Sequence, residues 1–146
     1  DVLHRLLARA EVDMTLFFRA LADIDVEAPT LAPFEEAFYS AAGRAAHGEA
    51  LQAWLDTYAA RLRQEGRPAE QRRAQMNVAN PCYVLRNYLA QQAIDAAEQG
   101  DTSVIDQTLE VLRRPYEVQP GRAAFAARRP DWARRKAGCS MLSCSS

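Results

Sequence analysis

The amino-acid sequence predicts an all-α protein, an irregular multi-helix bundle of about five to seven helices with an extended C-terminal arm. Three observations support this fold class. Apolar residues recur at steps of three and four positions in several long segments. No stretch alternates apolar and polar positions with β-branched side chains, so we expect almost no strand. Prolines, asparagines and glycines that can begin or end helices separate the apolar segments.

The N-terminal half is predicted to contain three helices. The first covers residues 2–22, and its apolar positions are Leu3, Leu6, Leu7, Ala10, Met14, Phe17, Phe18 and Leu21. The acidic segment 23–33 contains two prolines and is interpreted as a loop, after which Pro33 opens a short helix. A longer helix then ends near Gly66, with an apolar face of Leu51, Trp54, Leu55, Tyr58 and Leu62. The polar segment 67–73 is interpreted as a short helix or a linker.

A central, buried helix is predicted to run from Pro81 to Gly100. The side chain of Asn80 can cap its first turn, and Pro81 has no N–H that would be left unpaired there. Gly100 is suited to the left-handed residue that follows a helix. Arg86 and Asn87 lie within an apolar run, where an unpaired polar group is costly. We therefore expect both to be structural anchors whose side chains reach carbonyl or carboxylate groups.

The chain after Gly100 is predicted to form one more helix and then an arm. Residues 101–115 begin with capping side chains and end at a proline. Prolines, a glycine and basic clusters then interrupt any long helix, and Phe125 and Trp132 are the expected anchors of the arm. The predicted organisation is a helical domain of residues 1–115 and a C-terminal arm with a cysteine-containing tail, residues 116–146.

Composition and motifs indicate neither a metal site nor a nucleotide site within this chain. His4 and His47 are isolated, and the cysteines form no C-x-x-C pair. Neither G-x-G-x-x-G nor a Walker loop occurs, and the acidic residues of the first half are interpreted as a solvated face. We therefore predict no catalytic residue and no bound metal in this chain.

Charge and hydropathy argue against two further classes of partner. The basic residues 128–136 could contact nucleic acid, but the net charge is −1, whereas nucleic-acid-binding domains usually carry a basic excess. Packing of the arm on the acidic first half is the preferred interpretation. No apolar run approaches the roughly 20 residues that a membrane helix needs, so no membrane partner is expected.

The three cysteines fall into two groups. Cys82 is interpreted as a small buried hydrophobic residue. Cys139 and Cys144 lie together near the end of the chain, where a bend would bring the two sulfur atoms into reach of each other. The basic residues 134–136 would favour the reactive thiolate form. The spacing alone leaves open whether these two cysteines are redox-active or merely exposed.

Several motifs, in the same order along the chain, resemble the C-terminal region of the selenoprotein O family. They are D-x-T-x-x-F-R-x-L at 13–21, W-L-x-x-Y-x-x-R-L at 54–62, M-N-x-x-N-P-x-Y-V-L-R-N-Y-L at 76–89, A-I-x-x-A-x-x-G-D at 93–101, R-P-Y at 114–116, P-D-W at 130–132 and C-S-S at 144–146. The resemblance is specific because the long central block and the C-S-S end occur together.

The resemblance implies a parent protein with an activity that this chain does not carry by itself. Members of the family are pseudokinases that bind ATP in a flipped orientation with a divalent metal and transfer AMP to protein hydroxyl groups. The resemblance therefore implies that the parent is a protein adenylyltransferase of the bacterial cytoplasm that acts on protein substrates. It also implies that a preceding kinase-like domain holds ATP and Mg²⁺. That domain is absent from this chain, which would support it and bind no cofactor itself.

The family resemblance also assigns a role to the cysteine tail. The penultimate redox residue of the family maps onto Cys144, and in the family it is thought to pair with another cysteine and to regulate activity. Cys139 is a possible partner, although four residues separate the two here and only two separate the pair in selenocysteine-containing members. The partner can equally lie in the preceding domain.

Two other functions remain as alternatives at this point. The first is a stand-alone helical interaction module without catalytic activity. The second is a small thiol–disulfide protein that cycles Cys139 and Cys144. The chain begins at Asp1 and its helical pattern starts at once, so we expect it to be a piece of a longer protein.

Overall fold

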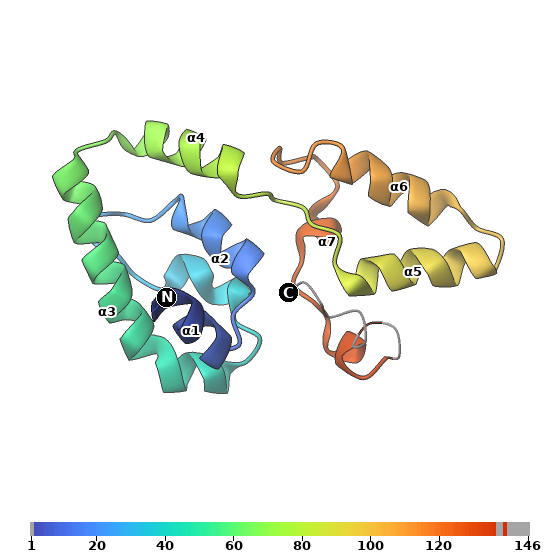
Figure 1. The fold of residues 1–146 in the computed structure, drawn as a ribbon, viewed down its shortest axis with the longest axis horizontal. Helices are drawn as coiled ribbons and strands as arrows, with labels where there is room; N and C mark the ends of the chain where they lie inside the picture. The colour runs from blue at the N-terminus through green and yellow to red at the C-terminus, as the bar shows by residue number, and fades with distance from the viewer. Residues whose placement is uncertain (1, 137–138, 140–146) are drawn as a thin grey trace. The chain divides into compact units, whose positions relative to one another are not determined.

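The computed structural model describes residues 2–136 and 139, and within them the chain is helical. The α-helices are α1 (Val2–Arg9), α2 (Met14–Leu21), α3 (Ala41–Glu65), α4 (Ala69–Ala79), α5 (Asn87–Glu98), α6 (Ser103–Leu112) and α7 (Ala123–Ala126), and the 3-10 helices are η1 (Ala32–Ala37) and η2 (Asp131–Arg134) (Figure 1). The described residues form no strand, and a single antiparallel bridge joins Val12 to Phe38. The predicted all-α class is confirmed.

The helices form two compact units, Asp1–Pro81 and Cys82–Ser146. The first unit contains α1 to α4 with η1, and the second contains α5 to α7 with η2. The domain boundary predicted between residues 115 and 116 stays a prediction. No helix of the described chain is both long enough and apolar enough to cross a membrane.

The predicted single helix over residues 2–22 is wrong, because the chain turns between α1 and α2. Glu11 adopts a left-handed conformation with φ 49°, which ends the helical path. Asp13 then starts α2 as its N-cap, and its Oδ1 accepts a hydrogen bond from the Leu16 N–H at 3.1 Å. The hydroxyl of Tyr39 donates to the other carboxylate oxygen at 3.0 Å. Apolar periodicity continues across the turn because both helices cover the same core.

The core of the first unit is built around Phe17, which is 1% exposed. Its ring stacks on Phe34 with centroids 4.7 Å apart and meets the ring of Phe18 edge-on at 5.6 Å. Helix α3 crosses the end of α1 so closely that a Cβ at Gly43 would lie 2.6 Å from the Ala10 carbonyl oxygen. The helix ends where the sequence predicts, at Gly66 with φ 64°.

The predicted central helix is wrong at its start: it begins at Asn87 and not at Pro81. Asn80 ends the preceding helix α4, since both its backbone N–H and its Nδ2 donate to the Met76 carbonyl oxygen, at 2.9 and 3.0 Å. Because a residue before proline is disfavoured in the helical region, Asn80 is extended, with φ −110° and ψ 112°. Residues 81–86 therefore form an irregular connection.

The second unit is held together by contacts that the irregular connection makes. The N–H groups of Cys82 and Tyr83 both donate to the Pro115 carbonyl oxygen, at 2.7 and 3.1 Å. The Tyr83 hydroxyl accepts from the Gln119 N–H at 2.9 Å. Helices α5 and α6 pack against each other after a turn at Gly100, which has the predicted left-handed conformation with φ 85°.

Candidate functional site

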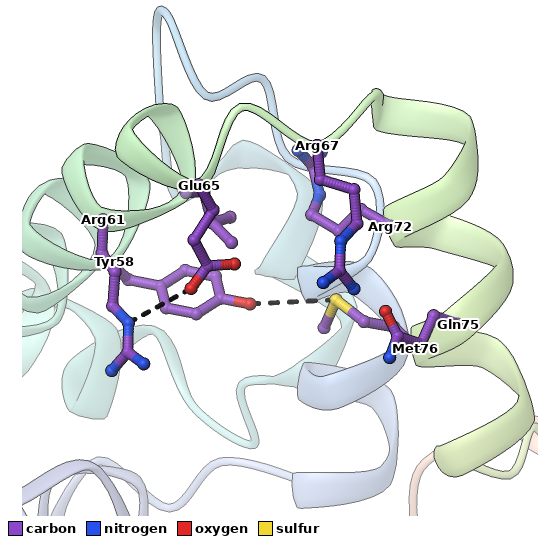
Figure 2. Close-up of a pocket in the computed structure, with 8 residues that line it drawn as sticks. Tyr58, Arg61, Glu65, Arg67, Arg72, Gln75 and Met76 are labelled. Atoms are coloured by element: carbon purple, nitrogen blue, oxygen red, sulfur yellow. Dashed lines mark hydrogen bonds and ion pairs between the residues drawn. The ribbon is translucent and has the colours of Figure 1, made fainter.

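The first unit contains a cavity of about 240 Å³ between the C-terminal part of α3 and helix α4. Its lining comprises Tyr58, Arg61, Leu62, Glu65, Arg67, Arg72, Gln75 and Met76. Figure 2 shows Tyr58, Arg61 and Glu65 on the α3 side and Arg72, Gln75 and Met76 on the α4 side. Three arginines and one glutamate make the charge of this lining positive.

Arg72 is the only one of the lining arginines that is buried, with 7% of its surface exposed. Its Nη2 donates to the Ile24 carbonyl oxygen at 2.8 Å. Its Nε is buried and has no acceptor, and no carboxylate pairs with the guanidinium, among the residues that the structure describes. A buried charge without a counter-charge is energetically costly. The cavity therefore has a cationic wall that a neighbouring anion would stabilise.

The other polar groups of the cavity differ in how far they are already engaged. Arg61 pairs with Glu65 at 3.3 Å, so these two charges offset each other. The Tyr58 hydroxyl donates to the sulfur of Met76 at 3.8 Å, and a thioether is a weak acceptor. Burial raises the pKa of this hydroxyl above its ordinary value of 10.0, while the nearby Arg72 opposes the rise. Tyr58 therefore remains protonated, and a hydrogen-bond donor, at neutral pH.

The predicted anchor residues lie at the connection between α4 and α5. Arg19 of α2 holds the end of α4, because its Nη1 donates to the carbonyl oxygens of Asn77 and Asn80 at 3.2 and 3.1 Å. The carbonyl oxygen of Arg86 begins α5 by accepting from the N–H groups of Leu89 and Ala90, at 2.9 and 3.1 Å. That the side chains of Arg86 and Asn87 act as structural anchors stays a prediction.

Of the two tail cysteines, only Cys139 lies within the described residues. Cys139 is 5% exposed and packs with Tyr88, Leu89 and Ala133, so the interpretation of this thiol as an accessible tail residue is wrong. The apolar side chains of α5 and η2 provide enough contact surface to cover it. Cys144, the other predicted redox residue, lies outside the described residues. Cys82 is half-buried in the connection before α5, not in a helix.

Lys136 fastens the arm to α5 through an ion pair with Asp95. The Asp95 carboxylate also accepts from Gln91 Nε2 at 2.8 Å, and the Lys136 ammonium lies 5.8 Å from the centre of the Trp132 ring. The hydrogen bond from Lys136, followed by that from Gln91, lowers the pKa of Asp95. The same hydrogen bond to Asp95 raises the pKa of Lys136.

The anchoring of the arm should therefore depend on pH in both directions. Because the pKa of Asp95 is lowered, its contribution is complete above the ordinary value of 3.8 and is lost as pH falls through the folded-state value. The pKa of Lys136 is raised, so its contribution is present below the ordinary value of 10.5 and is lost as pH rises through the folded-state value. We expect Trp132 fluorescence, measured in a Trp54→Phe background, to change at both extremes.

The matched variants for this titration are Asp95→Asn and Asp106→Asn. Asp95→Asn removes the charge partner of Lys136 and should shift the neutral-pH signal toward that seen at the extremes. Asp106 is an exposed carboxylate on α6, and its replacement should leave the wild-type profile unchanged. An Asp95→Asn profile identical to that of the wild type would show that the ion pair does not hold the arm.

No pattern in the sequence indicates the cavity, since its residues come from two separately predicted segments. Arg72 lies in the polar run interpreted as a short helix or a linker, and its burial follows only from the packing of α4 on the loop that carries Ile24. In the part of the chain that the structure describes, no three residues among histidine, cysteine, aspartate and glutamate gather where they could hold a metal ion.

The described residues define a helical protein of two compact units, with a positively charged cavity in one and a buried thiol in the other. A family model described as "Protein adenylyltransferase SelO" matches residues 1–113. The chain belongs to this family. The resemblance found in the sequence is thereby confirmed.

Curated relatives support the same assignment over the whole chain. The protein nucleotidyltransferase YdiU of Azoarcus sp. (strain BH72) is 64% identical over 146 residues. The proteins of the same name from Aromatoleum aromaticum and Xanthomonas axonopodis pv. citri are 59% and 60% identical over the same length. The alignment includes all of this chain but 28% of each relative, so the chain spans little more than a quarter of their length.

Proposed function

We propose that this chain forms the C-terminal region of a selenoprotein O-type protein adenylyltransferase. The complete enzyme transfers AMP from ATP to the hydroxyl groups of serine, threonine or tyrosine in other proteins. The observation that carries this proposal is the sequence identity of 59–64%, in alignments that cover the whole chain, to proteins named protein nucleotidyltransferase. Identity at this level over two helical units supports a shared fold and a shared place in the enzyme.

The chain's role in that enzyme is to support a kinase-like domain. Phosphoryl-type chemistry needs a positioned metal ion, groups that hold the phosphates and a group that positions the nucleophile. We assign ATP and Mg²⁺ to the kinase-like domain, and we assign neither to a residue of this chain. The exposed apolar side chains of the second unit, among them Ile94, Leu109 and Val118, are 45, 51 and 74% exposed and are available for contact with that domain. The proposed location is the bacterial cytoplasm.

The proposed redox role rests on Cys144. The burial of Cys139 under the side chains of α5 and η2 disfavours it as a partner, because a disulfide would require that packing to open. A cysteine in the kinase-like domain is therefore the favoured partner. In this arrangement a disulfide would tie the end of the chain to the catalytic domain and couple oxidation to AMP transfer.

A chimeric enzyme tests the supporting role. The region of the Azoarcus protein that aligns with this chain is replaced by the chain, and AMP transfer from labelled ATP to protein is measured in the presence of Mg²⁺. We expect the chimera to retain activity and a deletion of the region to lose it. A folded chimera without activity, or a fully active deletion, would contradict the proposal.

The redox role is tested in the same chimera. Treatment with an oxidant should change the rate of AMP transfer, and a reductant should restore the original rate. Cys144→Ser should remove this response, whereas the matched variant Cys139→Ser should keep it. A response that survives Cys144→Ser would assign the regulation to another residue.

A further inference from the structure

We propose that the cavity between α3 and α4 is a binding site for a phosphate group, held by Arg67, Arg72 and Tyr58 without a metal ion. The site lies wholly within the first unit and is independent of the AMP-transfer activity proposed above. It also differs from a catalytic nucleotide site, which needs a cation to neutralise the phosphates. The ligand is either free phosphate or a small phosphate monoester.

The first observation behind this proposal is the uncompensated charge of Arg72. Only 7% of the surface of Arg72 is exposed, and its guanidinium makes one hydrogen bond, to the carbonyl oxygen of Ile24. Buried arginines usually pair with a carboxylate or a phosphate, because an unpaired buried charge destabilises the fold. Within the described residues no carboxylate pairs with the Arg72 guanidinium. An anion bound in the adjoining cavity would supply the missing counter-charge.

The second observation is that two more donors of the cavity are available. Arg67 is exposed at the link between α3 and α4 and makes no hydrogen bond or ion pair with the described residues. Tyr58 keeps its proton at neutral pH and directs it to the Met76 sulfur, 3.8 Å away. A phosphate oxygen is a much stronger acceptor than a thioether, so the hydroxyl would turn toward it.

The chemistry of the lining selects the class of anion. Guanidinium groups present paired N–H donors that match the oxygen atoms of phosphate, and a dianion can engage both Arg67 and Arg72. Because Glu65 pairs with Arg61, it does not compensate the charges of Arg67 and Arg72. Leu62 and Met76 provide an apolar part of the lining, against which the body of a phosphate monoester could lie. The two sources of phosphate therefore predict different affinities.

The test is a titration of this chain with inorganic phosphate and with phenyl phosphate, at constant ionic strength maintained with chloride. Binding is followed by the backbone amide shifts of a ¹H–¹⁵N spectrum and by the melting temperature. We expect saturable shifts confined to residues 58–76, with a dissociation constant on the order of 1 mM. Tighter binding of phenyl phosphate would identify an ester as the ligand, and equal binding would identify free phosphate.

Matched variants separate the site from general charge effects. Arg67→Ala should weaken phosphate binding at least about tenfold without unfolding the protein, because Arg67 is exposed. Arg9→Ala removes an equally exposed arginine from α1 of the same unit and should leave binding unchanged. Tyr58→Phe should weaken binding by a smaller factor. Arg72→Met should abolish phosphate binding. If the Arg72→Met variant does not fold, Arg67→Ala remains the decisive test.

The proposal is overturned by any of three results. These are the absence of a saturable shift with either phosphate compound, shifts of equal size with chloride alone, or equal losses of affinity in Arg67→Ala and Arg9→Ala. The last two would show that phosphate responds only to the overall field of the basic side chains.

Discussion

Replacement of Phe17 by alanine should reduce the free energy of unfolding of the first unit by about 3–5 kcal/mol. Phe17 is 1% exposed, and its ring lies beside the rings of Phe18, Phe34 and Trp54, with centroids 5.6, 4.7 and 6.3 Å away. Truncation removes the buried ring and leaves a cavity that three aromatic neighbours, held by α2, η1 and α3, cannot fill. The loss is a large fraction of the stability of a small domain.

The measurement is urea unfolding followed by Trp54 fluorescence in a Trp132→Phe background, so that the signal comes from the first unit alone. Met14→Ala is the matched control on the same helix, because Met14 is 39% exposed and its truncation should cost less than about 1 kcal/mol. A Phe17→Ala variant as stable as Met14→Ala would mean that the aromatic cluster does not hold α2 in place.

The Gln119→Leu substitution should reduce the stability of the second unit by roughly 1–3 kcal/mol, the net contribution of two hydrogen bonds. Gln119 is 8% exposed, and its Nε2 donates to the carbonyl oxygens of Val111 and Arg114 at 2.9 and 3.0 Å. The Val111 carbonyl lies in the last turn of α6 and the Arg114 carbonyl just beyond it, and each also accepts a longer bond from a backbone N–H, that of Arg114 at 3.3 Å and that of Glu117 at 3.4 Å. Leucine fills a similar volume but cannot donate, so each carbonyl would lose its shorter hydrogen bond and keep the longer one from the backbone.

Unfolding of this variant is followed by Trp132 fluorescence in a Trp54→Phe background. Gln107→Leu makes the same chemical change at an exposed position of α6 and should alter stability by less than about 0.5 kcal/mol. Equal stabilities of the two variants would show that the carbonyls at the end of α6 find water or other donors when Gln119 is absent. The experiment thus measures what the glutamine contributes to helix termination.

The pairing of Gln119 with Tyr83 illustrates what local sequence patterns cannot contain. The two residues lie 36 positions apart and exchange hydrogen bonds through the Tyr83 hydroxyl. Neither residue type marks such a contact, since both are common on protein surfaces. The same holds for Arg72, whose partner Ile24 lies 48 positions earlier. Sequence periodicity reports neighbours three and four positions apart, and these contacts arise only when whole helices pack.

The Asn80–Pro81 pair shows a different limit. Its residue types correctly indicate a helix terminus, but they do not show whether the preceding helix ends there or a new helix begins. An asparagine before a proline can cap a following helix, and this was the prediction. In the structure its Nδ2 instead donates backward to the carbonyl oxygen of Met76. Both arrangements satisfy a helix terminus, and in the structure the residues after Pro81 donate to a distant group instead, because the Pro115 carbonyl oxygen accepts from the N–H groups of Cys82 and Tyr83.

The sequence by itself determined the helical class, the ends of helices at Gly66 and Gly100, and the membership of the SelO family, because each depends on local residue types and their order. Only the tertiary structure decided the break at Glu11, the burial of Cys139 and the cavity around Arg72. The physical reason is that burial and charge compensation depend on which distant surfaces meet, and a periodic pattern specifies a face without specifying what covers it.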